Sequence, residues 1–322
     1  MKIGLDSYSF RYAAGIWGWQ ADACLTPEGY LRVAAELGLA GVHFADLRHF
    51  ESLETAYLTS LRREAEAAGL YIELGTGGTD PGHLGEALRA AKTLGSPVLR
   101  TFVGGFRWHS EITGAALVSQ AAKNLREALP VAEKLGVRIA LENHLDLTTA
   151  ELLDLLGAVG SDCLGVCLDT GNGLGLLEDP VASAEALAPH TFTTHLKEFR
   201  AVLRREGLVL RGAPLGQGDV PNADIVPILR QSNPLGEALA LNVETALERV
   251  TVPVFASGFA DRLGKLDPGD VLRLLSHLDF DRSSTADQLA LPEERGASVE
   301  EVLAAERAQV AESAARALQQ FA

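Results

Sequence analysis

Four side chains that can bind a metal ion or move a proton follow four consecutive apolar segments of this chain: Glu142, Asp169, His195 and Glu244. The carboxyl ends of parallel barrel strands meet on one face, so we expect these side chains to converge. Three converging carboxylates repel one another unless a cation lies between them. A donor set rich in oxygen, with one nitrogen and no thiolate, favours Mn²⁺, with Co²⁺, Mg²⁺ and Zn²⁺ as alternatives. Otherwise each residue is a separate strand-end cap or salt-bridge partner.

Eight strand-like segments alternate with helical patterns and would position these residues. They span residues 3–8, 41–46, 70–76, 98–103, 138–142, 164–169, 191–196 and 239–244. Several are continuously apolar, which is typical of parallel strands covered by helices. Eight such units close a barrel, so the sequence predicts an α/β fold of the (β/α)8 TIM barrel type. A doubly wound open sheet is the competing architecture.

Two stretches depart from this alternation. Residues 201–205 and 208–211 flank Glu206-Gly207 and predict a hairpin inserted after the seventh strand. Beyond residue 265 we expect a short helix, a polar linker and a final helix, over residues 268–278, 279–288 and 299–318. The prediction is therefore a catalytic barrel over residues 1–265, followed by a helical extension over residues 266–322. The extension would pack on the barrel or on a second subunit, so a homo-oligomer is one expectation.

Composition narrows the classes of function. The 322 residues include 28 basic and 43 acidic side chains, a net charge of −15, which argues against binding to nucleic acid or to anionic lipid. No apolar run approaches the roughly 20 residues that a membrane span needs. The N-terminal residues enter a strand pattern at once, without a signal peptide. Three cysteines cannot form a paired disulfide framework. We therefore expect a cytoplasmic protein that binds neither nucleic acid nor membranes.

About the first 260 residues resemble the xylose isomerase-like TIM barrels, particularly the branch of ketose 3-epimerases, hydroxypyruvate isomerases and inosose-processing enzymes. The most specific matching segments are Leu141-Glu142-Asn143-His144, Leu168-Asp169-Thr170-Gly171-Asn172, His195-Leu196-Lys197-Glu198, Pro214-Leu215-Gly216-Gln217-Gly218-Asp219 and Asn242-Val243-Glu244. The resemblance implies that Glu142, Asp169, His195 and Glu244 bind one divalent metal ion. It also implies that Glu142 and Glu244 are the catalytic acid and base.

The implied chemistry has a physical basis. Epimerisation beside a carbonyl removes a proton from carbon and returns one to the other face, through an anionic enediolate. A metal ion stabilises that charge as a Lewis acid, while two carboxylates on opposite sides move the proton. Aldose–ketose isomerisation uses the same groups. The resemblance therefore implies a metal-dependent sugar isomerase or epimerase with a small sugar or polyol as its substrate.

One motif departs from the epimerase pattern. Well-studied ketose 3-epimerases tend to have a histidine three residues after the metal-binding aspartate, where this chain has Asn172. Instead, His144 lies two residues after Glu142, so both side chains point the same way on a strand. A similar Glu-Asn-His segment occurs in relatives that act on oxidised glycosides by elimination. His144 is therefore either a second base or hydrogen-bond donor to substrate, or a loop histidine bonded to backbone.

Further residues are candidates for substrate binding. Lys197, two residues after His195, either stabilises an enediolate or forms a salt bridge with a nearby carboxylate. Arg100 and Glu73 either line the floor of the pocket or form a buried pair. Trp17 and Trp108 either stack on a sugar and exclude water, or pack between loops. The predicted substrate-binding set is His144, Asn172, Lys197, Trp17, Trp108, Arg100 and Glu73.

Three other functions compete with the isomerase. A lyase or dehydratase would begin with the same proton abstraction, from a keto-sugar, an inosose or a 3-keto-glycoside, and then lose a leaving group. Phosphodiester cleavage is suggested by the apurinic-site endonucleases, which share the fold. Those enzymes use more histidines and a basic DNA-binding face, which this acidic chain does not predict. A sugar-binding or scaffold protein without metal is the third alternative.

Overall fold

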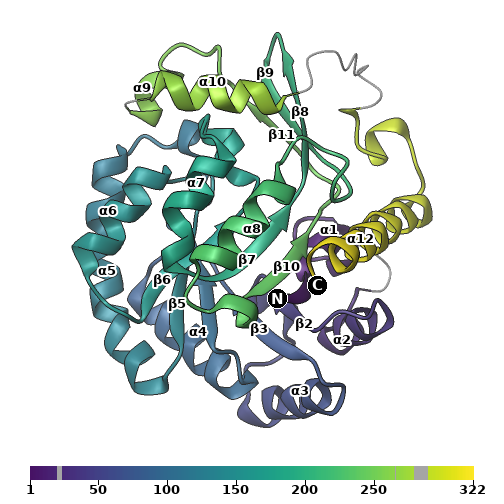
Figure 1. The fold of residues 1–322 in the computed structure, drawn as a ribbon. Helices are drawn as coiled ribbons and strands as arrows, with labels where there is room; N and C mark the ends of the chain where they lie inside the picture. The colour runs from purple at the N-terminus through teal and green to yellow at the C-terminus, as the bar shows by residue number, and fades with distance from the viewer. Residues whose placement is uncertain (20–23, 265, 279–288) are drawn as a thin grey trace.

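The computed structural model describes residues 1–19, 24–264, 266–278 and 289–322 and forms a closed barrel of eight parallel strands (Figure 1). Around the barrel the order is β1-β10-β7-β6-β5-β4-β3-β2. The strands are β1 (Lys2–Asp6), β2 (Gly41–Phe44), β3 (Tyr71–Gly75), β4 (Val98–Thr101), β5 (Arg138–Glu142), β6 (Leu164–Asp169), β7 (Thr191–Lys197) and β10 (Ala240–Glu244). This confirms the predicted TIM barrel, and the closed sheet excludes the doubly wound alternative.

Helices surround the barrel and connect successive strands. They are α2 (Pro27–Glu36), α3 (Thr55–Ala67), α4 (Pro81–Leu94), α5 (Gly114–Leu135), α6 (Thr149–Val159), α7 (Pro180–Leu187) and α8 (Asn222–Ser232). Local hydrogen bonds and backbone conformation determine where these helices begin and end. The Thr26 hydroxyl accepts from the Gly29 N–H and Pro27 occupies the first turn of α2. Gly136 ends α5 with a φ of 65°, a conformation that glycine adopts without strain.

A second sheet rises above the barrel, at the top of Figure 1. It contains β8 (Phe199–Arg204) and β9 (Gly207–Gly212), the predicted hairpin, and also β11 (Arg249–Val252). The third strand was not predicted. It pairs antiparallel with β9, so the segments after β7 and after β10 form one sheet. This sheet therefore joins the segments that follow Lys197 and Glu244, the last residues of β7 and β10 and two of the predicted site residues.

The C-terminal part supplies short helices and the last long helix. They are α9 (Phe259–Leu263), α10 (Pro268–His277) and α12 (Val299–Phe321), while α1 (Arg11–Ala14) follows the first strand. The predicted linker over residues 279–288 lies outside the described residues. Helix α12 packs against β1 and β10, where the ring of barrel helices closes (Figure 1). Among the described residues, we find no helix with the length and hydropathy needed to cross a bilayer.

One polar face of α12 holds loops at the carboxyl end of the barrel. Glu306 accepts from the backbone N–H groups of Tyr12 (2.7 Å) and Ala13 (3.0 Å). Gln309 donates to the Thr245 carbonyl at 2.8 Å, next to Glu244. Ser313 lies 2.8 Å from the Thr245 hydroxyl and accepts from the Leu215 N–H at 3.0 Å. The last helix is thus bonded to three separate loops around the site.

This contact predicts a pH dependence of stability. Burial raises the pKa of Glu306 to about 7, so between pH 4 and 7 the folded chain keeps a proton that the unfolded chain releases. The free energy of unfolding therefore falls as pH rises through that window. We expect Glu306→Gln, which stays neutral, to lose less stability between pH 5 and pH 8 than the unmodified protein. Urea unfolding at four pH values measures this, and parallel profiles would contradict it.

Candidate active site

The barrel brings the four predicted metal-binding residues to one point. Glu142, Asp169 and Glu244 are the last residues of β5, β6 and β10, and His195 lies near the end of β7. Parallel pairing places Asp169 opposite His195, so neighbouring strands bring their side chains to similar height. One ligand atom from each of the four residues lies within 4.8 Å of the others. All four residues are buried.

The donor set fits a divalent cation. Glu142 Oε2, Asp169 Oδ2, His195 Nδ1 and Glu244 Oε2 are buried atoms that form no hydrogen bond of good geometry with the described residues. Each belongs to a different member of the cluster. Two of them have a close ionic neighbour: Arg100 Nε lies 2.5 Å from Glu142 Oε2, and His195 Nδ1 lies 2.7 Å from Glu244 Oε2. A buried polar atom left unbonded is costly, and a hard cation coordinated by oxygen and imidazole nitrogen satisfies all four at once. These residues therefore have the chemistry of a site for one divalent ion.

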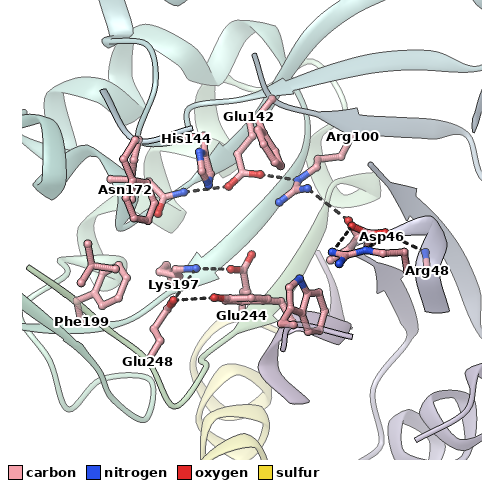
Figure 2. Close-up of a pocket in the computed structure, with 17 residues that line it drawn as sticks. Asp46, Arg48, Arg100, Glu142, His144, Asn172, Lys197, Phe199, Glu244 and Glu248 are labelled. Atoms are coloured by element: carbon pink, nitrogen blue, oxygen red, sulfur yellow. Dashed lines mark hydrogen bonds and ion pairs between the residues drawn. The ribbon is translucent and has the colours of Figure 1, made fainter. Parts of the chain in front are cut away.

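Glu142 is held by two neighbours. Its Oε2 lies 2.5 Å from Arg100 Nε, and its Oε1 accepts from Asn172 Nδ2 at 2.9 Å (Figure 2). Arg100 also donates to the Thr76 carbonyl at 3.1 Å, which fixes its orientation. Although burial opposes ionisation, the Arg100 guanidinium keeps the pKa of Glu142 well below its usual range.

Glu244 is held by Lys197 in the same manner. The Lys197 ammonium contacts the Glu244 carboxylate directly and lies 3.3 Å from Glu248 Oε1. Burial would raise the pKa of Glu244, but Lys197 and His195 lower it to about 2. Tyr8 donates to Glu248 at 3.0 Å, which extends the network to the first loop. Each of the two predicted catalytic glutamates is thus ion-paired with a buried cation.

Asp169 is the carboxylate least compensated by protein cations. Its Oδ1 accepts from the N–H groups of Gly171 and Asn172, both at 2.8 Å, and Lys197 Nζ lies 3.9 Å from its Oδ2. Burial, with the charges of Glu244 and Glu142, raises the pKa of Asp169 to about 7 despite Lys197. Asp169 is therefore the member of the cluster that a bound cation would stabilise most in its ionised form.

A second group lies behind His195 and was not predicted. His195 Nε2 is 3.3 Å from His43 Nδ1 and 3.4 Å from Asp6 Oδ2, and His43 is hydrogen-bonded to Asp6. Outer partners of this kind orient the ring of a ligating histidine. The three residues come from β1, β2 and β7. Neither Asp6 nor His43 stands out in the sequence, since each lies in an apolar strand.

A cavity of about 330 Å³ opens above the cluster. Aromatic side chains form much of its wall, and His144 stacks on Phe102 with ring centroids 4.5 Å apart and planes at 17°. His144 Nδ1 is buried and has no hydrogen-bond partner among the described residues. In Figure 2, the side chains of Glu142 and Glu244 approach the cavity from opposite sides. The aromatic lining comprises Tyr8, Trp17, Phe102, Phe106 and Phe199.

The structure brings most of the predicted substrate-binding residues to this cavity. Those that line it are His144, Asn172, Lys197, Trp17 and Arg100. Trp108 and Glu73 are not among the described lining residues. Trp108 is buried against Phe106, and Glu73 accepts from Thr193 and Asn242 inside the barrel. Glu73 lies in the interior of the barrel because it precedes the end of its strand by two residues.

Three charged lining residues were missed by the sequence analysis. Asp46 and Arg48 follow β2 and form a bidentate pair, with distances of 2.9 and 2.8 Å. Glu248 precedes β11 and reaches Lys197. Asp46 ends a predicted strand, which is the one signal that could have identified it. The positions of the other two depend on loop conformations that residue spacing does not reveal.

With this geometry established, comparison with known proteins defines the class. The model of the xylose isomerase-like TIM barrel family matches residues 31–245, and the chain belongs to this family. The chain is 32% identical over 221 residues to a 3-oxo-isoapionate decarboxylase from Pectobacterium atrosepticum, covering 68% of this chain and 77% of that protein.

Solved structures share the fold at low sequence identity. A D-psicose 3-epimerase solved in the presence of D-fructose superposes with a TM-score of 0.63 and 16% identity, covering 100% of this chain and 99% of that one. The IOLI protein with a bound zinc atom has a TM-score of 0.57 and 15% identity, covering 88% and 100%. These similarities establish the barrel architecture.

The buried donor set predicts stoichiometric metal binding. We expect one Mn²⁺ per chain and a melting temperature that rises with Mn²⁺ concentration, because the ion binds only the folded state. Asp169→Asn should weaken binding by more than about 100-fold, beyond the usual effect of losing an outer partner. Calorimetry and elemental analysis measure this, with the exposed Asp154→Asn as the matched control. Equal affinity in the two variants would exclude Asp169 as a ligand.

Proposed function

We propose that this protein is a metal-dependent lyase that decarboxylates a 3-oxo sugar acid. The observation that carries the proposal is the pairing of both catalytic glutamates with buried cations, Glu142 with Arg100 and Glu244 with Lys197. An epimerase needs one group to remove a proton from carbon and another to donate one. Two carboxylates held ionised have no proton to donate at neutral pH. Decarboxylation requires an electron sink and a single proton, and the similarity to a 3-oxo-isoapionate decarboxylase supports this choice.

The proposed decarboxylation has two steps, cleavage of a carbon–carbon bond and protonation of carbon. The bond between the carboxylate and the adjacent carbon breaks, CO₂ leaves, and the electron pair moves into the 3-oxo group to give an enediolate. That carbon then takes one proton and the ketone is restored. A divalent ion held by Glu142, Asp169, His195 and Glu244, proposed as Mn²⁺, would supply Lewis-acid stabilisation of the negative charge on oxygen. The zinc named with the IOLI structure supports the expectation that proteins of this fold bind a divalent metal ion.

The residues around the cluster have separate parts in this scheme. Arg100 and Asn172 fix Glu142, and Lys197 fixes Glu244, so neither carboxylate rotates away from the cluster. The aromatic wall excludes water, which favours loss of CO₂ because the charge of the carboxylate spreads as the bond breaks. His144 is the proposed proton donor. Its ring is held against Phe102, and it lines the cavity.

The decisive experiment offers the metal-loaded protein 3-oxo sugar acids and neutral ketoses in D₂O. Release of CO₂ with one deuterium at the carbon that lost the carboxylate supports the lyase. Exchange at a C–H of a neutral ketose with a new diastereomer, and no CO₂, would instead support an isomerase or epimerase. That second candidate is favoured by the placement of Glu142 and Glu244 on opposite sides of the cavity. No reaction of either kind with metal bound would contradict both.

Glu244→Gln tests the cluster itself. We expect the variant to fold but to lose turnover by at least about 1,000-fold, since it removes a buried charge from the site that stabilises the transition state. Steady-state CO₂ release measures the loss, and circular dichroism checks the fold. The exposed Glu36→Gln, on α2, is the matched control and should retain full activity. Normal turnover in Glu244→Gln would remove this residue from the mechanism.

His144→Ala tests the protonation step. If the parent acid is R–CO–CH(OH)–COO⁻, the product in D₂O is R–CO–CHD–OH, which has a chiral deuterated carbon. We expect the unmodified enzyme to give one configuration and His144→Ala to give both, because solvent then delivers the proton from either face. NMR after chiral derivatisation distinguishes them. A single configuration from the variant would assign the proton to another donor.

A further inference from the structure

The β8–β9–β11 sheet has two unlike faces. Phe199 and Val250 point to the active-site cavity and line it. Because side chains alternate along a strand, Arg200, Arg211 and Arg249 lie on the opposite face. The register places Arg200 opposite Arg211, and Arg211 opposite Arg249, in one row across the three strands. One side of the sheet therefore covers the site, and the other presents a row of arginines.

Further arginines extend this row. Arg204 lies on the same face of β8, and Arg205 follows it at the turn. We call these five residues the arginine face: Arg200, Arg204, Arg205, Arg211 and Arg249. Like charges directly opposite one another on a sheet are destabilising. Their concentration is notable in a chain whose net charge is −15.

A surface cavity of about 540 Å³ lies against this face. Arg204, Arg205 and Arg249 line it, together with Glu206 and the hydroxyl-bearing Thr251. Val209 and Thr251 are paired across β9 and β11, which confirms that the cavity lies on the arginine side. The cavity is thus separate from the active site and lies on the other side of the same sheet.

The hydrogen bonds on this face leave some of the guanidinium N–H groups without an acceptor. Arg249 pairs with Glu294 through two contacts of 2.7 Å. Arg211 Nη1 donates to the Gly212 carbonyl at 2.7 Å, and Arg200 Nη2 to the Gln217 carbonyl at 3.3 Å. Among the described residues, Arg200 Nε, Arg204 Nη2 and Arg211 Nε are buried atoms with no hydrogen-bond partner. Of these three donors, Arg204 Nη2 belongs to a residue that lines the cavity, while Arg200 and Arg211 lie beside it on the same face of the sheet.

We propose that the arginine face binds a phosphate-type oxyanion. Guanidinium groups match tetrahedral oxyanions in charge and in the spacing of their paired N–H donors. Glu206 at the cavity and Glu294 on Arg249 limit the excess positive charge, which favours a small anion over a long polyanion. A bound anion would connect β8 to β11 on the side of the sheet that faces away from the active site. The inference is independent of the reaction proposed above.

Titration with inorganic phosphate tests the proposal. Calorimetry on the metal-loaded protein, at ionic strength held constant with chloride, should show saturable binding to one site, with a raised melting temperature. The same titration on metal-stripped protein should give the same affinity, which separates this site from the metal cluster. Arg204→Ala/Arg205→Ala should weaken binding at least tenfold. Arg62→Ala/Arg63→Ala on α3 is the control with the same change in charge and should bind normally.

Clear outcomes would overturn the inference. They are absence of saturable binding, loss of binding only when metal is removed, and undiminished affinity in Arg204→Ala/Arg205→Ala. Circular dichroism checks that this variant folds. If it does not, Arg204→Lys/Arg205→Lys keeps the charge but loses the paired donors, and should still weaken binding severalfold. If the lysine variant binds phosphate as tightly as the unmodified protein, the proposal is also contradicted.

Discussion

The convergence of three buried carboxylates at the carboxyl end of the barrel is the constraint on which the rest of the site depends. Glu142, Asp169 and Glu244 lie within reach of one ion, and each would repel the others in a medium of low dielectric. Arg100 and Lys197 compensate two of them. Asp169 is left with two backbone N–H groups, a distant ammonium and the His195 ring at 3.9 Å, so it gains most from a cation that joins the cluster.

This constraint explains the surroundings of the cluster. Arg100 is itself buried, and its donors are used by Glu142 and by the Thr76 carbonyl, so it cannot turn to solvent. Asn143 holds the backbone of Asp169 through two hydrogen bonds, of 2.8 and 2.7 Å. The aromatic wall then lowers the local dielectric and strengthens each of these pairs. In enzymes generally, preorganised charge is usually the largest single contribution to rate acceleration.

Much of the fold and the centre of the site could be predicted from sequence because both depend on local patterns. Continuous apolar segments identify parallel strands that helices cover. Glu142 and Asp169 each end such a segment, so both must lie at the carboxyl-terminal face of the barrel. Residues in loops could not be placed in this way. Trp108 and Trp17 look alike in the sequence, yet one packs behind Phe106 and the other lines the cavity. Strand β11 was missed because its pairing with β9 joins segments about forty residues apart.

Helix α12 has a consequence for the order in which the chain is made. Its residues Gln309 and Ser313 bond to Thr245, beside Glu244, and Glu306 bonds to the segment after the first strand. A ribosome synthesises these residues only after all eight barrel strands, because α12 follows β10 in the chain. The hydrogen bonds that tie the segments after β1 and β10 to α12 therefore form only once α12 has been synthesised. A nascent chain that stops before α12 already contains all four candidate ligands but lacks the hydrogen bonds that hold two of the loops around them.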